Sequence, residues 1–254
     1  MLDKIKKIVN QKYFHIIVIA VIIIVLLFIL LMTMLDYNEN GEKNMPFNLS
    51  KITIISTSEG MDKQVEGKKW AFDIDQNNDI YLYIEKNNKN AKDKNQAIES
   101  IVLDNFTITR DNQKGEVKIY KPDNASEKQI FTNKEENVEN TIVFKGDTES
   151  NFKNLKISNQ GDVLAFRCAT KNIASYESDA EEEINHGELL KKAGVTLEDL
   201  KEKLTFDITI NLYSGKSYKA EIKLDLPAGN ILEEATTNTE IKDVSNIAFK
   251  RINN

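Results

Sequence analysis

An uninterrupted apolar run from Tyr13 to Leu35 is the feature that most constrains what this chain can fold into. It reads YFHIIVIAVIIIVLLFILLMTML and contains no Asp, Glu, Lys or Arg. As an α-helix it would be about 34 Å long, which exceeds the roughly 30 Å of a bilayer's hydrocarbon core. The run therefore predicts one transmembrane helix, residues 13–35.

The charged residues beside the run predict its direction in the membrane. Four lysines and one aspartate lie within residues 1–12, whereas Asp36 and Glu39 follow the run. Lys and Arg favour the cytoplasmic side of a membrane. We therefore expect residues 1–12 to form a cytoplasmic tail. The rest of the chain is expected to be an extracytoplasmic domain of a single-pass cell-membrane protein.

A cleaved secretory signal peptide is the competing interpretation. Its apolar region is usually about 7–15 residues long and is followed by a cleavage site of small residues. This run is longer, and the residues Met34-Leu35-Asp36-Tyr37 offer no such site. The pattern therefore favours an uncleaved anchor.

Net charge and cysteine content limit the classes of function that the extracytoplasmic part can have. The chain carries −6 overall and its first twelve residues carry +3, so the remainder carries −9. Such an acidic body argues against binding nucleic acid or anionic lipid. Cys168 is the single cysteine, so no disulfide forms within the chain, although secreted eukaryotic domains usually carry them. Together with heavy use of Ile, Lys and Asn, this favours a bacterial envelope.

The part after the helix reads as an all-β ectodomain. Residues 36–47 are polar and predict a short linker. Beyond them, segments rich in β-branched and aromatic residues alternate with polar turns. The clearest hairpin joins Leu204–Tyr213 and Ser217–Leu226 across a turn that contains Gly215. The other predicted strands are Lys51–Ser56, Lys69–Asp75, Asp79–Glu85, Ile98–Thr109, Glu116–Lys121, Thr141–Lys145, Leu155–Ser158, Val163–Ala169 and Val244–Ile252.

These β patterns occur twice along the chain. Gln76–Tyr83 parallels Asn159–Phe166, and in each a polar turn ends in Asp before an apolar strand. A repeat of this length is domain-sized, unlike the shorter units of solenoids. The sequence predicts two tandem β-sandwich-like modules, residues 48–135 and 136–254. The alternatives are one larger sandwich, or a chance resemblance between β-rich segments.

One region of the second module is predicted to be a short helical insert, residues 176–203. Ser178 and Glu181 have the spacing of a capping box at a helix start. Leucines then recur at helical spacing on both sides of Gly194. The runs are short, so we expect helices of one or two turns between strands.

Calcium is the sharpest candidate for a bound cofactor. Oxygen-bearing side chains occupy the first, third, fifth and seventh positions of one stretch, as in an EF-hand loop. Two positions depart from that motif, since Asn78 stands where Gly is needed and Ile84 where a bidentate Glu belongs. The alternative is a tight Asn-Asn turn joining two strands, with no cofactor. The candidate ligands are Asp73, Asp75, Asn77 and Asp79.

No motif specifies a catalytic chemistry. An N-terminal anchor before a β-rich exterior domain also describes sortases, which use His, Cys and Arg in that chain order. Here Arg167 and Cys168 lie on a predicted strand, but His186, the one histidine outside the apolar run, follows them. We therefore interpret Cys168 as a small residue buried in a β layer and assign no catalytic residue.

Four aromatic residues gather in the first module at alternate strand positions. They fit either a platform for a sugar or, as we predict, the hydrophobic core of that module. The residues are Trp70, Phe72, Tyr81 and Tyr83.

The expected function is binding or structural, in a bacterial cell envelope. The module would hold a protein or a cell-wall polymer near the membrane, with no nucleic-acid partner. Two alternatives remain: an enzyme that acts on envelope polymers through carboxylates, and an accessory subunit of a membrane complex. The apolar run contains no Gly and so lacks a small-residue packing motif. We therefore expect a plain anchor.

Overall fold

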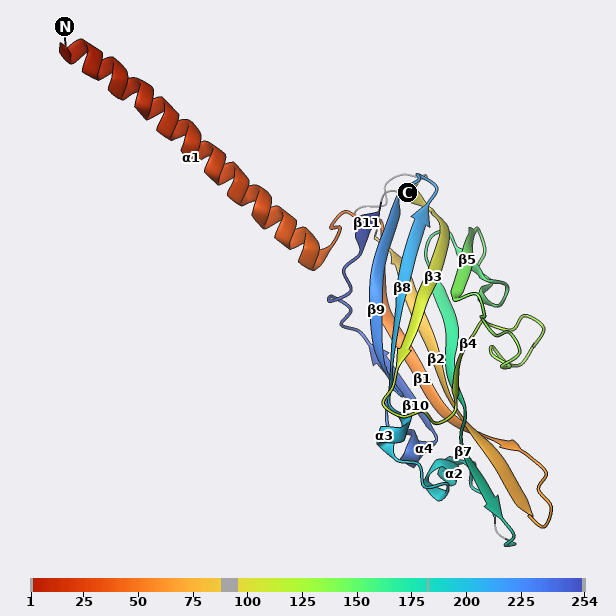
Figure 1. Ribbon diagram of the computed structural model, residues 1–254. Helices are drawn as coiled ribbons and strands as arrows, with labels where there is room; N and C mark the ends of the chain where they lie inside the picture. Colours follow the sequence, from red (N-terminus) through yellow and green to blue (C-terminus); the bar gives the residue numbers. More distant parts are fainter. Residues whose placement is uncertain (1, 88–95, 182, 253–254) are drawn as a thin grey trace.

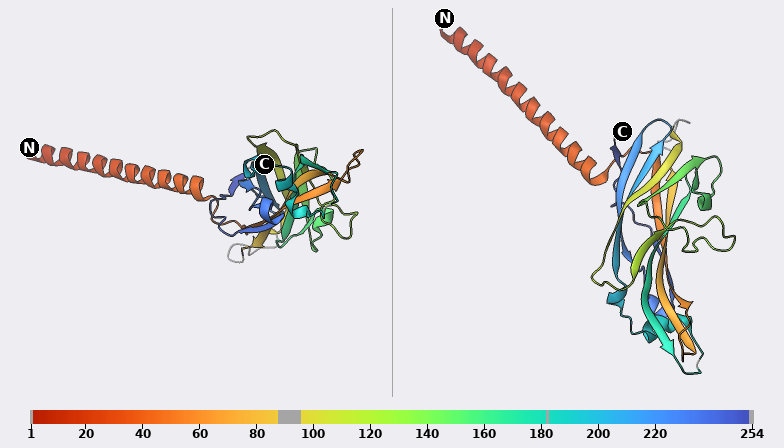
Figure 2. Two further views of the ribbon diagram at one scale, coloured as in Figure 1. Left: turned by 90° about the horizontal axis from the view of Figure 1, so that it is seen from below. Right: turned by 45° about the vertical axis from the view of Figure 1, so that its right-hand side comes forward.

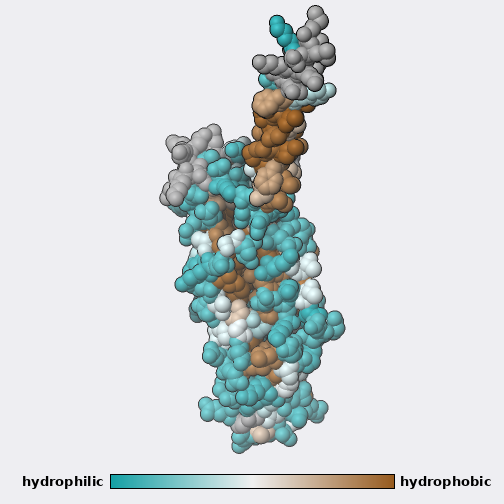
Figure 3. All heavy atoms as spheres, turned by 90° about the vertical axis from the view of Figure 1, so that its left-hand side faces the viewer, coloured by the Kyte–Doolittle hydropathy of each residue, from teal (hydrophilic) through white to brown (hydrophobic). Residues whose placement is uncertain are grey.

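The computed structural model describes residues 2–87, 96–181 and 183–252. Its N-terminal helix α1 spans Leu2–Asn40. Within it, Tyr13–Asn40 is long and apolar enough to cross a membrane, and its most apolar window is not covered by the rest of the protein. Figure 3 shows this apolar helix beside a mostly hydrophilic body.

The helix continues past the apolar run. The predicted linker, residues 36–47, is wrong for its first part, because residues 36–40 are helical. The hydroxyl of Tyr37 accepts a hydrogen bond from the backbone nitrogen of Arg251 at 2.9 Å. Arg251 belongs to the last strand, β11 (Lys250–Ile252). The end of the helix is therefore fastened to the C-terminal part of the body.

The strands of the described residues form two sheets (Figure 1). The first sheet has the order β10-β1-β2-β7-β4 and the second the order β11-β9-β8-β3-β5-β6. Neighbours are antiparallel except β5 and β6, which are parallel. The remaining strands are β1 (Phe47–Asp62), β2 (Trp70–Lys86), β3 (Ile98–Thr109), β4 (Glu116–Tyr120), β5 (Thr141–Asp147), β6 (Lys156–Ser158), β7 (Val163–Ser178), β8 (Glu202–Leu212), β9 (Ser217–Leu226) and β10 (Thr236–Ile241).

Both sheets contain strands from both predicted modules. In the first sheet β2 pairs with β7, and in the second β3 pairs with β8. Contrary to the predicted tandem arrangement, residues 48–135 and 136–254 therefore do not form separate sheets. The two halves look alike because every half-buried strand shows the same alternation, which does not specify its partner. The predicted β8–β9 hairpin is confirmed, with Asn211 opposite Ser217.

One hydrophobic cluster joins the inner faces of the two sheets. Phe166 of the first sheet meets Phe206 of the second edge to face, with 5.1 Å between ring centroids. Phe106 lies against both rings, at 5.3 and 5.6 Å. Aromatic pairs of this geometry stabilise a core beyond the area that they bury.

The predicted turn between Lys69–Asp75 and Asp79–Glu85 is wrong, because β2 runs through it without a break. Its polar residues stay in the strand because they find partners inside the protein. Asn78 accepts a hydrogen bond from Ser56 at 2.7 Å, and Gln76 donates to the backbone carbonyl of Leu200 at 3.3 Å. A buried polar group with a partner avoids the cost of desolvation.

The long strands β1, β2 and β7 continue past the second sheet as an arm (Figures 1 and 2). The arm has its own hydrophobic cluster, in which Phe72, Ile74 and Ile173 of the strands pack against short helices. The helical elements of this region are η3 (His186–Glu188), α2 (Leu189–Lys192), α3 (Leu197–Leu200) and α4 (Ile231–Glu234). These helices cover the inner face of the arm, where the second sheet is absent.

The predicted insert, residues 176–203, is therefore helical only in part. Strand β7 runs to Ser178, and no helix begins at the predicted capping box. The capping box that forms lies at α3, where Thr196 and Asp199 satisfy each other's backbone nitrogens. Ser178 belongs to a strand and does not begin a helix, because β7 pairs with β2 up to that residue.

Candidate functional site: the outer face of the first sheet and its cleft

The four candidate calcium ligands lie in a row on β2. Alternate strand residues share a face, and Ile80 and Leu82 point into the core. Asp73, Asp75, Asn77 and Asp79 therefore point away from the second sheet, and we call this side the outer face. Neighbours in the row are spaced by roughly 6.7 Å along the strand. Among the described residues, no group of three His, Cys, Asp or Glu could hold a metal ion.

At the arm end of the row, the carboxylate of Asp73 pairs with Lys63, which directly follows β1. Lys63 Nζ lies 2.9 Å from Asp73 Oδ1 and 3.5 Å from a carboxylate oxygen of Glu177. Ser175 Oγ also donates to Asp73 Oδ1, at 2.7 Å. The hydrogen bond from Lys63, followed by that from Ser175, holds the pKa of Asp73 below its ordinary value. This part of the outer face is a satisfied ion-pair network.

Asp75 fastens an irregularity in β7. The register between β2 and β7 shifts next to this residue, and Asn172 adopts a positive φ of 53°. Asp75 Oδ1 accepts the backbone nitrogen of Asn172 at 2.9 Å, and Lys171 Nζ forms an ion pair with Oδ2. Asp75 is 1% exposed, and its contacts with Asn172 and Lys171 hold the bulge of β7 in place.

Arg167 of β7 and Asp79 form the centre of the outer face. The guanidinium meets the carboxylate with both nitrogens of its fork, Nε–Oδ1 at 2.5 Å and Nη2–Oδ2 at 3.0 Å. Its remaining nitrogen, Nη1, donates to Asn133 Oδ1 at 2.9 Å. The Phe131 ring lies against the guanidinium, 5.0 Å from its carbon. A bidentate, stacked arginine of this kind is rigid.

The aromatic residues of β2 divide between the two faces, which corrects the prediction that all four fill a core. Phe72 is buried in the arm cluster, and Trp70 stacks on it with 6.3 Å between centroids. Tyr81 and Tyr83 lie on the outer face. Burial, followed by the charge of Asp79, raises the pKa of Tyr81 to about 12. The four rings form no common platform.

A cleft of about 650 Å³ opens beside this face. One wall is the outer face, with Glu59, Asp79 and Arg167, and the other is the segment 128–133 of the connection between β4 and β5. Lys171 also lines the cleft. Concave sites with a few fixed polar groups are where proteins most often bind ligands. The cleft is the best candidate functional site of the molecule.

Hydrogen bonds hold the connection that forms the second wall. Asp123 donates its backbone nitrogen to the carbonyl of Ile130 at 2.7 Å and accepts a hydrogen bond from the Thr132 hydroxyl. The bond from Thr132 is the main reason why the pKa of Asp123 lies below its ordinary value. Lys153 donates to the carbonyls of Ser126 and Gln129, at 2.6 and 2.9 Å. The wall is therefore a folded loop with a fixed position.

A second polar cluster is buried between the sheets around Glu202. Its Oε2 accepts a hydrogen bond from the Thr170 hydroxyl at 2.9 Å, and its Oε1 accepts one from Asn78 Nδ2 at 3.3 Å. Cys168 Sγ lies 3.6 Å from Oε1. Burial raises the pKa of Glu202 above its ordinary value, against the lowering effect of the hydrogen bonds.

Cys168 is fully buried, as predicted. Burial, with a further contribution from the charge of Glu202, raises the pKa of its thiol well above the ordinary value. A thiol must ionise and be accessible in order to act as a nucleophile. Cys168 is therefore suited to packing rather than to covalent chemistry.

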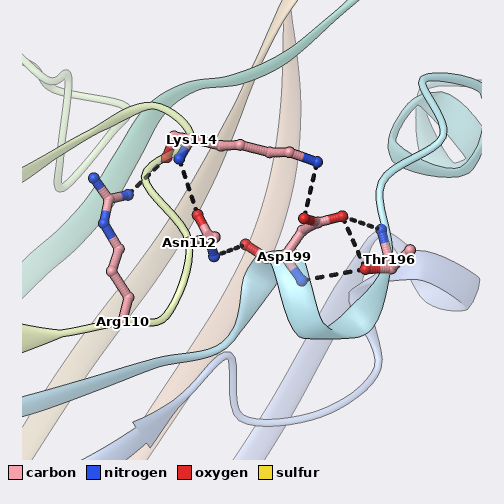
Figure 4. A network of polar contacts seen from close by, with 5 residues as sticks. All are labelled: Arg110, Asn112, Lys114, Thr196 and Asp199. Atoms are coloured by element: carbon pink, nitrogen blue, oxygen red, sulfur yellow. Dashed lines mark hydrogen bonds and ion pairs between the residues drawn. The ribbon is translucent and has the colours of Figure 1, made fainter.

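A smaller cleft of about 470 Å³ borders Glu202 and Arg110. The turn that follows β3 forms part of its rim and is bound to α3 (Figure 4). Lys114 Nζ pairs with Asp199 at 2.8 Å, and Asn112 donates to the carbonyl of Asp199. Arg110 donates to the backbone carbonyl of Lys114 at 2.7 Å. These contacts brace the turn and leave Glu202 beneath it, 5% exposed.

No protein-family model matches this chain, and no curated protein or solved structure matches it either.

Sequence reasoning identified the row on β2 but missed the residues that complete the two polar clusters. Glu202 precedes Leu204, Phe206 and Ile208 at the same two-residue spacing, so it occupies the inward register of β8. A carboxylate at the inward positions of an alternating strand is therefore the sequence pattern that indicates a buried carboxylate. Arg167 carried no comparable signal, because its partners Asp79, Phe131 and Asn133 come from distant segments.

Proposed function

We propose that this chain is a single-pass membrane protein of a bacterial envelope whose β-sandwich-like body binds a ligand outside the cytoplasm. Helix α1 is the anchor, with the lysine-rich residues 1–12 on the cytoplasmic side, as the charge asymmetry favours. The observation that carries the binding function is the cleft between the outer face of the first sheet and segment 128–133.

The cleft suits binding because its polar groups are held in place before a ligand arrives. Arg167 is fixed by Asp79, Asn133 and Phe131, and the opposite wall is fixed by its own hydrogen bonds. Preorganised groups lose little entropy when they bind, which raises affinity. An anchored body of this kind would hold its ligand near the membrane.

Photocrosslinking from inside the cleft tests the binding function. Gln129 is exposed and lines the cleft, so a photoreactive amino acid at this position would reach a bound ligand in living cells. Lys223 is exposed on β9 of the other sheet and provides the matched control position. We expect a specific adduct at position 129 alone. No adduct at 129, or the same adducts at both positions, would refute the proposal.

Thiol labelling tests the orientation. Cys168 is buried, so the native protein gives little background with a membrane-impermeant maleimide. The variant Lys223→Cys places an accessible thiol on the body. We expect this variant to be labelled in intact cells. Labelling only after the cells are broken would place the body in the cytoplasm and reverse the proposed orientation.

A carboxylate-dependent enzyme is the second candidate, favoured by one observation. Glu202 has a raised pKa and borders the smaller cleft, and perturbed carboxyls in clefts are frequent in active sites. Against this, hydrogen bonds from Thr170 and Asn78 already occupy its two oxygens. If Glu202→Gln retains full activity in an assay of envelope-polymer turnover, Glu202 is not a catalytic acid or base.

A further inference from the structure

The cations of the cleft on the outer face are not equally engaged. Arg167 is held by Asp79, and Lys171 by Asp75. Lys128 lines the same cleft and is exposed, yet it forms no ion pair with any residue that the structure describes. In a body that carries −9, an available cation in a cleft favours an anionic group on the ligand.

The outer face also supplies a hydrogen-bond acceptor to the cleft, the carboxylate of Glu59. Asn77 is 1% exposed, and its Oδ1 has no hydrogen-bond partner among the described residues. Its Nδ2 donates to Glu59 Oε2 at 3.2 Å, and Glu59 lines the cleft. Asn77 itself does not line the cleft, so its hydrogen bond positions the exposed Glu59 carboxylate, which a ligand hydroxyl would meet.

The cleft offers little free aromatic surface. Phe131 lines the cleft, but it is 4% exposed and its ring lies against Arg167. Met61 is 47% exposed in the same cleft and offers a flexible apolar contact. The cleft therefore lacks a free aromatic face on which a flat ring would stack.

From these three observations we propose that the cleft binds a polyhydroxylated chain that carries anionic groups. Its phosphate or carboxylate would meet Lys128, its hydroxyl groups would meet Glu59, and its carbon backbone would lie on Met61. A polyol phosphate polymer and an acidic glycan share this chemistry. The inference rests on the proposed binding function and names its ligand class.

Binding measurements on the full chain in nanodiscs of uncharged lipid test the inference. The probes are poly(glycerol phosphate), a polyuronate, uncharged dextran and poly-glutamate, measured at low and at high salt. We expect one of the first two to bind, more weakly at high salt, with no binding of dextran or poly-glutamate. Which of the two binds distinguishes the polyol phosphate from the acidic glycan.

Charge reversal in the second wall provides the matched control. Lys128→Glu should weaken binding by at least about tenfold. Lys134→Glu changes the same charge in the same connection, at an exposed residue outside the cleft, and should leave binding unchanged. Equal effects of the two variants would overturn the inference, and so would binding of dextran or poly-glutamate that matches the anionic polyols.

The inference and the proposed function fail in different ways. If neither anionic polyol binds while crosslinking from position 129 captures a protein, the ligand class is wrong and the binding function stands. If neither probe binds and no crosslink forms, both proposals fall.

Discussion

Asn78 of β2 donates a hydrogen bond from Nδ2 to Oε1 of Glu202 on β8, at 3.3 Å, and thereby joins the two sheets inside the protein. On the inward side of β2, Asn78 and Gln76 lie between Ile80 of the main cluster and Ile74 of the arm cluster. A polar layer therefore separates the two hydrophobic clusters. Its cost is offset because most of its members are hydrogen-bonded.

Removing Asn78 should destabilise the protein. The variant Asn78→Ala leaves Ser56 and Glu202 without one buried partner each, so we expect the free energy of unfolding to fall by about 1–3 kcal/mol. Urea denaturation of the detergent-solubilised chain measures this change. Asn238→Ala, at an exposed position of β10, is the control and should change stability little. Equal losses in the two variants would contradict the role of the polar layer.

Glu202 should make stability depend on pH. Its folded pKa lies above the ordinary 4.5, so the folded protein holds this proton more tightly than the unfolded chain does. The stability of the native protein relative to Glu202→Gln should therefore fall as pH rises from about 4.5 through the raised pKa. The slope approaches about 1.4 kcal/mol per pH unit within that window.

Unfolding free energies measured from about pH 4 to about pH 8 check this dependence, because that range begins near the ordinary pKa of a glutamate and extends well above it. Glu221→Gln, at an exposed position of β9, is the control for removing one carboxylate. A difference between Glu202→Gln and the native protein that does not change with pH would show that burial does not raise the pKa of Glu202.

Asp199 should have the opposite dependence. The ion pair with Lys114, followed by the bonds from Thr196, lowers its pKa to about 2 (Figure 4). The ionised carboxylate therefore stabilises the folded state above the ordinary pKa of 3.8, and this contribution is lost as pH falls through about 2. Asp199→Asn should lower the thermal midpoint at about pH 5. The difference from the native protein should shrink as the pH falls to about 2. A midpoint at about pH 5 that is the same in Asp199→Asn and in the native protein would contradict this role of the carboxylate.

The row on β2 should not bind calcium. Asp73 and Asp75 are paired with Lys63 and Lys171, and the spacing along the strand keeps the ligands from converging. We expect titration calorimetry with millimolar calcium to show no saturable heat. Saturable heat that disappears in Asp75→Asn would restore the calcium hypothesis.

The arm should loosen independently of the main core. Leu189 is fully buried in the arm cluster, so Leu189→Ala should cost about 2–5 kcal/mol locally. Hydrogen exchange should then rise in the arm parts of β1, β2 and β7, while exchange in β8 and β9 stays slow. Leu197→Ala, at a side chain that is 41% exposed, is the control. A uniform rise across both sheets would mean that the two clusters unfold together.

Local patterns accounted for the elements that depend on neighbours in the chain. The apolar run predicted a helix long enough to cross a membrane, since length and composition suffice for that. Two-residue alternation predicted the β class and the hairpin of β8 and β9, whose partners are adjacent in sequence. The turn predicted at residues 76–79 was wrong. Polar side chains there resemble a turn sequence, but they have buried hydrogen-bond partners far along the chain.

By itself, the sequence determined a long apolar helix followed by a β-rich body, because hydrophobic length and periodicity are local properties. Only the tertiary structure decided that β2 lies beside β7, that Arg167 meets Asp79, and that Glu202 is buried against Asn78. These contacts join residues about 90 to 120 positions apart, a separation that no local pattern encodes. The cleft exists because distant segments are packed against one face of one sheet.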